Sequence, residues 1–184
     1  MTPHIGEDIR ALRKSRNWTL QALCNSVGRS VGWLSQVERG QTAPSIQDLS
    51  ALAAEFEVPI SFFFRSASQS EEERGLIVRG DMAEPIGSEE SGLRERLLSP
   101  NLNGNFEMIH STFSAHSACE TLISTKGRED GGVVIDGQLD LQLGGTWFTL
   151  ATGDSFQFSD DAYLWRNPYD APATVIWIVS PPVY

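Results

Sequence analysis

The chain has 184 residues, of which 40% are hydrophobic and 21% are charged, and its formal net charge is −10 at pH 7. The two cysteines, Cys24 and Cys119, lie far apart, and no apolar segment precedes the first helical pattern. From these features we expect neither a disulfide scaffold, nor a zinc finger, nor a secreted protein. No apolar run approaches the about 18 residues of a membrane-spanning helix, so we expect a cytoplasmic protein without a membrane partner.

Two short helices joined by a tight turn are predicted within residues 19–40. Thr19 and Ser30 each precede a helical segment and are typical N-caps, and Gly28 lies between the segments, where the chain must reverse. Apolar residues recur at helical spacing in both segments: Leu20, Leu23, Leu34 and Val37. The pattern predicts a helix-turn-helix.

The second of these helices has a polar side that would face away from the core. At about 100° per residue, burial of Leu34 and Val37 turns Gly32, Ser35 and Gln36 outward and leaves Val31 and Trp33 at the flanks. A glutamine can pair with adenine through two hydrogen bonds, a glycine permits close backbone approach, and an apolar side chain can meet a thymine methyl group. The pattern favours a recognition helix, although exposed polar helix faces also occur in proteins that never contact DNA.

The surrounding sequence resembles the lambda-repressor-like, or XRE-type, DNA-binding domain. The resemblance lies in LRKSRNWTLQAL, SVGWLSQVERG and PSIQDLSALAAEFEVP, and it covers residues 5 to about 64. It implies five helices, a buried structural salt bridge between Arg13 and Glu38, and phosphate contacts near 19–21 and 39–42. Leu20 departs from the glutamine often found at its position. The predicted DNA-binding residues are Thr19, Gln21, Arg29, Ser30, Val31, Gly32, Trp33, Ser35, Gln36, Arg39, Gln41 and Thr42.

Charge is distributed unevenly along the chain. Residues 1–64 hold six Lys and Arg against six Asp and Glu, whereas residues 65–184 hold eight against eighteen. Six of the basic residues fall within residues 10–40, where Glu38 is the only acid: Arg10, Arg13, Lys14, Arg16, Arg29 and Arg39. They could be ordinary solvated charges or a local basic face for phosphates. Because the domain as a whole is not basic, we expect a homodimer that binds two half-sites of double-stranded operator DNA, about 34 to 36 Å apart.

A change of composition and of apolar period predicts a second domain. The polar stretch RSASQSEEER predicts a linker over 65–74, which separates a helix-turn-helix domain at 1–64 from a domain at 75–184. In that domain apolar residues alternate with polar ones around Leu139 and Leu141, and TVIWIVS is strongly β-branched. With frequent Gly and Pro punctuation, this pattern predicts short antiparallel strands in a barrel or sandwich.

The order of strands and turns in this second domain resembles a cupin. The turn residues that carry the resemblance are Gly137, Gly153-Asp154 and Asn167-Pro168. The match is good over roughly 106–182 and is only positional over 75–105. The resemblance implies an antiparallel cupin β-barrel, or jelly roll, that senses a ligand and dimerises.

The cupin metal motif is missing from this sequence. Where that family places two histidines and a glutamate before Gly137, residues 124–130 read STKGRED, and Tyr163 replaces the histidine of the second motif. At most Glu129 or Asp130 remains, and one carboxylate cannot hold a transition metal that needs three or four fixed donors. We therefore predict no metal, no cofactor and no enzymatic activity.

The two histidines of this domain, His110 and His116, are six residues apart and could lie on one face of a strand, where they could form a substitute metal site. We prefer an interpretation in which one lies on a strand and the other in the following loop. The cavity of the barrel could still bind an effector, and convergent cations would select a small organic acid or another anion. The predicted effector-binding residues are Lys126, Arg128, Trp147, Tyr163, Trp165 and Arg166. Tyr163 is the strongest candidate because the histidine that it replaces faces the barrel interior in the metal-bearing family members.

The sequence thus favours a dimeric transcriptional regulator, with repression as the expected action, whose metal-free cupin domain binds a small-molecule effector. Two alternatives stay open. The cupin domain could serve dimerisation alone, or it could be an enzyme with a DNA-binding head attached.

Overall fold

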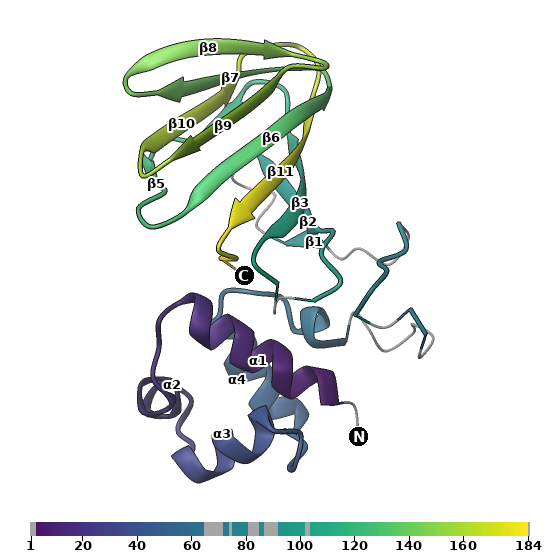
Figure 1. Ribbon diagram of the computed structural model, residues 1–184, viewed down its shortest axis with the longest axis vertical. Helices are drawn as coiled ribbons and strands as arrows, with labels where there is room; N and C mark the ends of the chain where they lie inside the picture. Colours follow the sequence, from purple (N-terminus) through teal and green to yellow (C-terminus); the bar gives the residue numbers. More distant parts are fainter. Residues whose placement is uncertain are drawn as a thin grey trace. The chain divides into compact units, whose positions relative to one another are not determined.

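The computed structural model describes residues 3–64, 72–73, 75–80, 85–86, 92–101 and 104–183 (Figure 1). The chain divides into two compact units, namely Met1–Glu84 with Ser99–Asn105 and Pro182–Tyr184, and Pro85–Leu98 with Phe106–Pro181. The predicted linker over 65–74 lies outside the described residues except at positions 72 and 73. Within the described part of the chain, no helix is both long and apolar enough to cross a membrane.

The first unit is helical. Its helices are α1 (Pro3–Ser15), α2 (Leu20–Val27), α3 (Val31–Glu38), α4 (Ile46–Glu55) and the short 3-10 helix η1 (Ile60–Phe64). The expectation of five α-helices is wrong for the described residues, which form four α-helices followed by η1. Glu57 adopts a left-handed conformation with φ 53°, and Pro59 disfavours a helical Val58 before it. The segment ISFFF then offers only β-branched, polar and aromatic residues of modest helix propensity.

The helix ends follow the local sequence signals. The hydroxyl of Thr19 accepts a hydrogen bond from the Ala22 amide at 3.1 Å, and that of Ser30 accepts one from the Trp33 amide at 3.1 Å. Both predicted N-caps are therefore confirmed. Gly28 ends α2 at φ 67°, a conformation that side-chain-bearing residues rarely adopt.

Close packing of α1 on α3 fixes the core of the helical unit. The side chains of Leu12, Leu34 and Phe56 are fully buried there. A Cβ atom at Gly6 of α1 would lie 2.1 Å from the carbonyl oxygen of Val37, so the helices can approach this closely only because a glycine occupies this position.

The second unit consists of two antiparallel sheets. Its strands are β1 (Pro85–Ile86), β2 (Leu93–Leu97), β3 (Glu107–Phe113), β4 (Ser117–Ala118), β5 (Ile123–Ser124), β6 (Glu129–Asp136), β7 (Gln138–Leu143), β8 (Thr146–Ala151), β9 (Ser155–Ser159), β10 (Ala162–Asn167) and β11 (Ala173–Ser180). One sheet has the order β1-β2-β3-β11-β6-β9, and the other has the order β4-β10-β7-β8 with β5 beside β10.

The expectation of a closed barrel is not met by the described strands, because no strand ladder joins the two sheets. They form two layers instead (Figure 1). Each sheet buries one apolar face against the other through side chains, and this burial does not require a continuous hydrogen-bonded cylinder.

Strand alternation decides which side chains fill the space between the layers. On β11, Val175, Trp177 and Val179 are buried, and on β10 the buried residues are Tyr163 and Trp165. The rings of Tyr163 and Trp177 stack with their centroids 5.4 Å apart. Facing residues of β10 and β11 therefore join the two sheets.

Candidate nucleic-acid interface and sandwich interior

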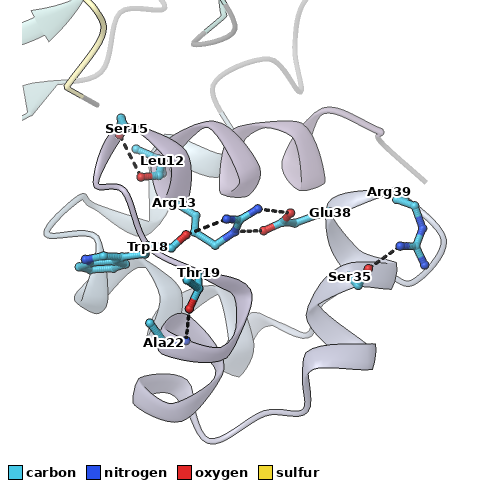
Figure 2. Close-up of polar contacts among 9 residues, drawn as sticks. All are labelled: Leu12, Arg13, Ser15, Trp18, Thr19, Ala22, Ser35, Glu38 and Arg39. Atoms are coloured by element: carbon cyan, nitrogen blue, oxygen red, sulfur yellow. Dashed lines mark hydrogen bonds and ion pairs between the residues drawn. The ribbon is translucent and has the colours of Figure 1, made fainter.

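A nearly buried ion pair links α1 to α3 (Figure 2). Arg13 Nε lies 2.6 Å from Glu38 Oε1 and Arg13 Nη2 lies 2.9 Å from Oε2, while Arg13 Nη1 donates to the Trp18 carbonyl oxygen at 2.8 Å. The hydrogen bond to Glu38 raises the pKa of Arg13 further above its usual value. The Arg13 and Glu38 side chains are only 12% and 6% exposed, so the expected structural salt bridge is confirmed.

The outer side of α3 carries an organised set of polar side chains. Gln36 and Gly32 are exposed, whereas Leu34 and Val37 of the same helix are buried. The Gln36 side-chain oxygen accepts a hydrogen bond from the Thr42 hydroxyl at 3.0 Å. The turn after α3 thus holds the glutamine in a defined orientation.

A second network lies beside it. Arg39 donates to the Ser35 hydroxyl, as Figure 2 shows, and to the side-chain oxygen of Gln41 at 3.2 and 3.3 Å. The structure therefore brings the C-terminal half of α3 and the following turn together as one polar surface. This surface holds five of the twelve predicted DNA-binding residues: Ser35, Gln36, Arg39, Gln41 and Thr42.

The other seven residues lie at the start of α2, in the turn that follows it and in the first turn of α3. Thr19 and Ser30 cap these helices, and Gln21 donates to the Asn25 side chain at 2.8 Å. Val31 and Trp33 are half-buried in the first turn of α3, beside the exposed Gly32. The first-turn amides of α2 and α3 lie at helix N-termini, where anions are favoured.

Arg29 is the best anchored of these residues. Its guanidinium lies 2.6 Å from the Asp48 carboxylate and 5.4 Å from the centre of the Trp33 ring. Asp48 also accepts hydrogen bonds from the amide and hydroxyl of Ser45 at 2.9 and 2.7 Å. Burial of Asp48 opposes ionisation, but its bonds to Ser45 and Arg29 prevail and lower the pKa of Asp48. Arg29 is therefore oriented by α4.

Strand alternation divides the predicted effector-binding residues into two groups. Tyr163 and Trp165 point into the sandwich and are 8% and 3% exposed. Arg166 points out of the other face of the sheet, where its guanidinium lies 4.2 Å from the centre of the Trp147 ring and 2.8 Å from the Asp140 carboxylate. The structure does not bring Arg166 and Trp147 together with Tyr163.

Arg128 lies near the interior group, and Lys126 is exposed. Arg128 Nε is 2.8 Å from Asp130 Oδ1, although neither atom has a well-aligned hydrogen bond, and Trp177 Nε1 donates to Asp130 Oδ2 at 3.0 Å. Asp130 is fully buried, and this burial raises the pKa of its carboxyl group. Burial, followed by the nearby Asp130 carboxylate, raises the pKa of Tyr163 above its ordinary range.

Asp130 and Trp177 were not predicted as site residues. The sequence feature that could have identified them is the alternation of side chains along β6 and β11. It turns Asp130 and Trp177 inward and their neighbours outward. Phe156 and Phe158 complete the aromatic lining, with their ring centres 4.6 Å from Trp177 and 5.3 Å from Tyr163, respectively. The interior is thus aromatic with one buried ion pair.

The residues at the expected cupin metal position do not fit a transition metal. In the part of the chain that the structure describes, no three His, Cys, Asp or Glu residues are grouped as metal ligands. His110 lies on β3, and His116 lies in the turn after it, with Nε2 3.1 Å from Asp170. The interpretation of one strand histidine and one loop histidine is confirmed.

Comparison with known proteins agrees with this two-part architecture. Residues 4–59 match the family of helix-turn-helix domains, and residues 120–179 match the family of cupin domains. The chain is 29% identical over 160 residues to the HTH-type transcriptional regulator SutR of Escherichia coli K12, covering 86% of this chain and 84% of that protein. It is 24% identical over 152 residues to the HTH-type transcriptional regulator PuuR of the same organism, covering 82% and 80%.

Among solved structures, an RmlC-like cupin from Shewanella frigidimarina matches 58% of this chain and 91% of its own, with 18% identity and a TM-score of 0.50. This likeness supports the cupin fold of the second unit. The two domain matches and the nearly full-length similarity to named regulators agree with the resemblance found in the sequence. The chain therefore carries an XRE-like helix-turn-helix domain followed by a cupin domain, and relatives that match most of its length are named HTH-type transcriptional regulators.

Proposed function

We propose that the protein is a dimeric repressor that binds operator DNA through α3 and a small-molecule effector through the interior of its cupin unit. The observation that carries the DNA-binding part is the polarity of α3. Leu34, Val37 and Glu38 anchor one side of the helix in the core, and Gln36 with Gly32 occupies the exposed side. Such a helix can enter the major groove without repacking the domain.

Gln36 is the proposed base reader. An amide oxygen has two lone pairs, so the bond from Thr42 leaves one acceptor site and both N–H donors for an adenine edge. In this proposal Thr42 positions the reader, and Gly32 and Trp33 approach the base pairs or the sugar wall. Arg39, Gln41 and the N-termini of α2 and α3 would contact phosphates, which set register and not sequence.

We infer that two DNA-binding domains act as a pair because each one carries no net positive charge. The helical residues 1–64 carry equal numbers of acidic and basic side chains, so non-specific attraction to phosphates is small. Two heads on one dimer would bind two half-sites at once and gain affinity through the high local concentration of the second head.

The effector site is proposed to be the interior that Tyr163, Trp177 and the Arg128–Asp130 pair border. Of the three cations considered for an anionic effector, Lys126 is exposed and Arg166 faces the other side of its sheet, so Arg128 remains. A carboxylate effector would bind the Arg128 guanidinium in place of Asp130. The buried Asp130, with its raised pKa, would then take up a proton and not remain as an unpaired charge.

The alternative in which the cupin unit only dimerises is favoured by one observation. Tyr163 and Trp165 are almost fully buried among other rings, so side chains already fill part of the interior. Thermal-shift measurements on the full-length protein with small organic acids, amino acids and amines distinguish the two. A ligand at 100 times its dissociation constant should add about 2.7 kcal/mol to stability. That gain should vanish in an Arg128→Met variant, and no shift with any compound supports the alternative.

The DNA-binding proposal is tested by replacing the side chains that are proposed to contact the base pairs. Gln36→Ala and Trp33→Ala should each weaken binding to a selected operator about 5- to 150-fold, equivalent to about 1 to 3 kcal/mol, while the helical circular dichroism stays unchanged. Gln47→Ala changes an exposed glutamine on α4 and is the matched control. If selection from random DNA returns the same preferred sequence for Gln36→Ala as for the wild type, α3 does not read bases through Gln36.

A further inference from the structure

The central strand of the six-stranded sheet is apolar on both of its faces. On β11, Val175, Trp177 and Val179 point into the sandwich, and Ile176 and Ile178 point to the opposite, outer face. Ile178 is 41% exposed. An antiparallel sheet with one solvated face usually carries polar residues there, whereas strands that are apolar on both sides are covered on both sides. The centre of the outer face, at Ile176 and Ile178 of β11, therefore has the composition of a surface that is covered.

The neighbours of β11 extend this apolar surface. Met108 on β3 is paired with Ile178, and Val133 on β6 is paired with Ile176. Gly131 of β6 is paired with Ile178 on the other side, and its missing side chain leaves a depression. A groove of about 390 Å³ follows these residues, and its lining includes Gly131, Val133, Ile176 and Ile178. The groove can accept an apolar side chain from a partner.

Charged residues flank this groove in a self-complementary arrangement. On one side, Arg96 of β2 is paired with His110 of β3, and His110 is paired with Ile176 of β11. Arg96 therefore lies at the same height along the sheet as Ile176. On the other side, Glu129 of β6 is paired with Ser180 of β11 and lies at the height of that residue. Ile178 lies midway between these two levels along β11, so any two-fold axis that exchanges Arg96 with Glu129 passes close to Ile178 and Met108. Two copies placed face to face around that axis would form the Arg96–Glu129 contact twice and bury the apolar centre between them.

We infer that this outer face, centred on Ile178 and Met108 and flanked by Arg96 and Glu129, is the surface on which a second copy of the chain docks. The inference rests on the dimer of the proposed function and names its interface. Six strands spaced about 4.8 Å apart span roughly 24 Å, and the three longest, β3, β6 and β11, have seven or eight residues and run roughly 23 to 26 Å. This is the scale of the about 800 Å² that each partner buries in a stable interface.

Sedimentation of the full-length protein over a range of concentrations tests this surface. Ile178→Lys should raise the dimer dissociation constant at least about a hundredfold, because the two-fold symmetry places a charge in both halves of the apolar centre. Phe148→Lys is the matched control, since Phe148 is 48% exposed but belongs to β8 in the other sheet. It should leave the dissociation constant unchanged.

A charge exchange provides a second, independent readout. Arg96→Glu and Glu129→Arg should each weaken dimerisation about three- to thirtyfold, and the double variant should return to within about threefold of the wild type. If Ile178→Lys fails to fold, this exchange decides alone, and a double variant no better than the single ones overturns the inference.

The outcomes separate the interface from the proposed function. If the wild type is a dimer and Ile178→Lys leaves that dimer intact, the second copy does not dock on this face, and something other than a second copy covers β11. The proposal that a dimer binds two DNA half-sites would still stand. A wild-type protein that stays monomeric at every concentration overturns both.

Discussion

Glu38→Ala should unfold the helical unit before it changes DNA sequence preference. The substitution leaves the Arg13 guanidinium, now 12% exposed and held by two short contacts to Glu38, without its carboxylate. Removal of one partner of a buried ion pair costs about 3 to 5 kcal/mol. A domain of this size has a total stability of about 3 to 9 kcal/mol, so the loss removes much or all of it.

Denaturant unfolding followed by helical circular dichroism isolates this effect, because all the described α-helices belong to one unit. Glu38→Gln keeps a hydrogen-bond acceptor and should lose less than Glu38→Ala. Arg39→Ala alters an exposed neighbour and should lose no more than about 0.5 kcal/mol. Below its own melting temperature, Glu38→Ala should still select the wild-type operator sequence.

The double variant Arg13→Met, Glu38→Leu tests the reason for the loss. If the cost comes from a buried unpaired charge, apolar replacements on both sides should recover most of it. Recovery should be incomplete by about 1 kcal/mol, because the Trp18 carbonyl loses the hydrogen bond from Arg13. A double variant as unstable as Glu38→Ala, or a loss below about 1 kcal/mol in Glu38→Ala itself, would refute the reasoning.

Three further predictions concern packing, pH and metal content. Gly6→Ala should destabilise the helical unit by about 1 to 3 kcal/mol in denaturant unfolding, because its Cβ would overlap the Val37 carbonyl oxygen. Gly32→Ala, with open space around its Cβ, should not destabilise the unit yet should weaken operator binding, and equal stability losses in both variants would contradict the packing argument. Asp48 has a lowered pKa in the folded state, so its contribution to stability is present above its unfolded pKa of about 3.9 and is lost as pH falls through the folded-state pKa. Asp48→Asn should therefore be less stable at neutral pH and should lose less stability than the wild type on acidification, as measured by unfolding at several pH values. Elemental analysis of the purified protein should find no equivalent of iron, manganese, nickel or zinc, whereas one tightly held equivalent would show that other residues form a metal site.

The helical unit was predictable in its details because its signals are local. Thr19, Ser30 and Gly28 act on the helix ends beside them, and the apolar spacing of Leu34 and Val37 fixes the inward side of α3. The Arg13–Glu38 pair spans 25 residues and came from the family resemblance. The failed expectation, a domain of five α-helices, depended on that resemblance. At η1 the local sequence opposes an α-helix, since Pro59 and the ISFFF segment favour a shorter turn.

The candidate effector site was harder to predict because it depends on which face each strand residue occupies. Tyr163 and Arg166 are three residues apart, an odd number, so alternation sends them to opposite faces of β10. The same rule, applied to β6, would have replaced Arg166 with Asp130 in the predicted set. Sheet order is the part that no local pattern gives: β11 lies beside β3 and β6 through pairings that cross much of the chain.

The two proposed sites of the cupin unit meet on one strand. Trp177 borders the interior and the adjacent Ile178 lies in the proposed docking face, so the two side chains share a peptide unit of β11. Protein interiors are close-packed, and an effector that moves Trp177 must therefore move the backbone that carries Ile178. If the effector binds dimer and monomer with different affinity, linkage requires that dimerisation change the effector affinity by the same factor. Measurement of the dimer dissociation constant with and without effector, and of effector affinity above and below that constant, should yield one coupling factor. Because this equality holds whatever carries the coupling, the decisive quantity is the size of the factor: a dimer dissociation constant that saturating effector leaves unchanged would show that the interior and the outer face are not coupled.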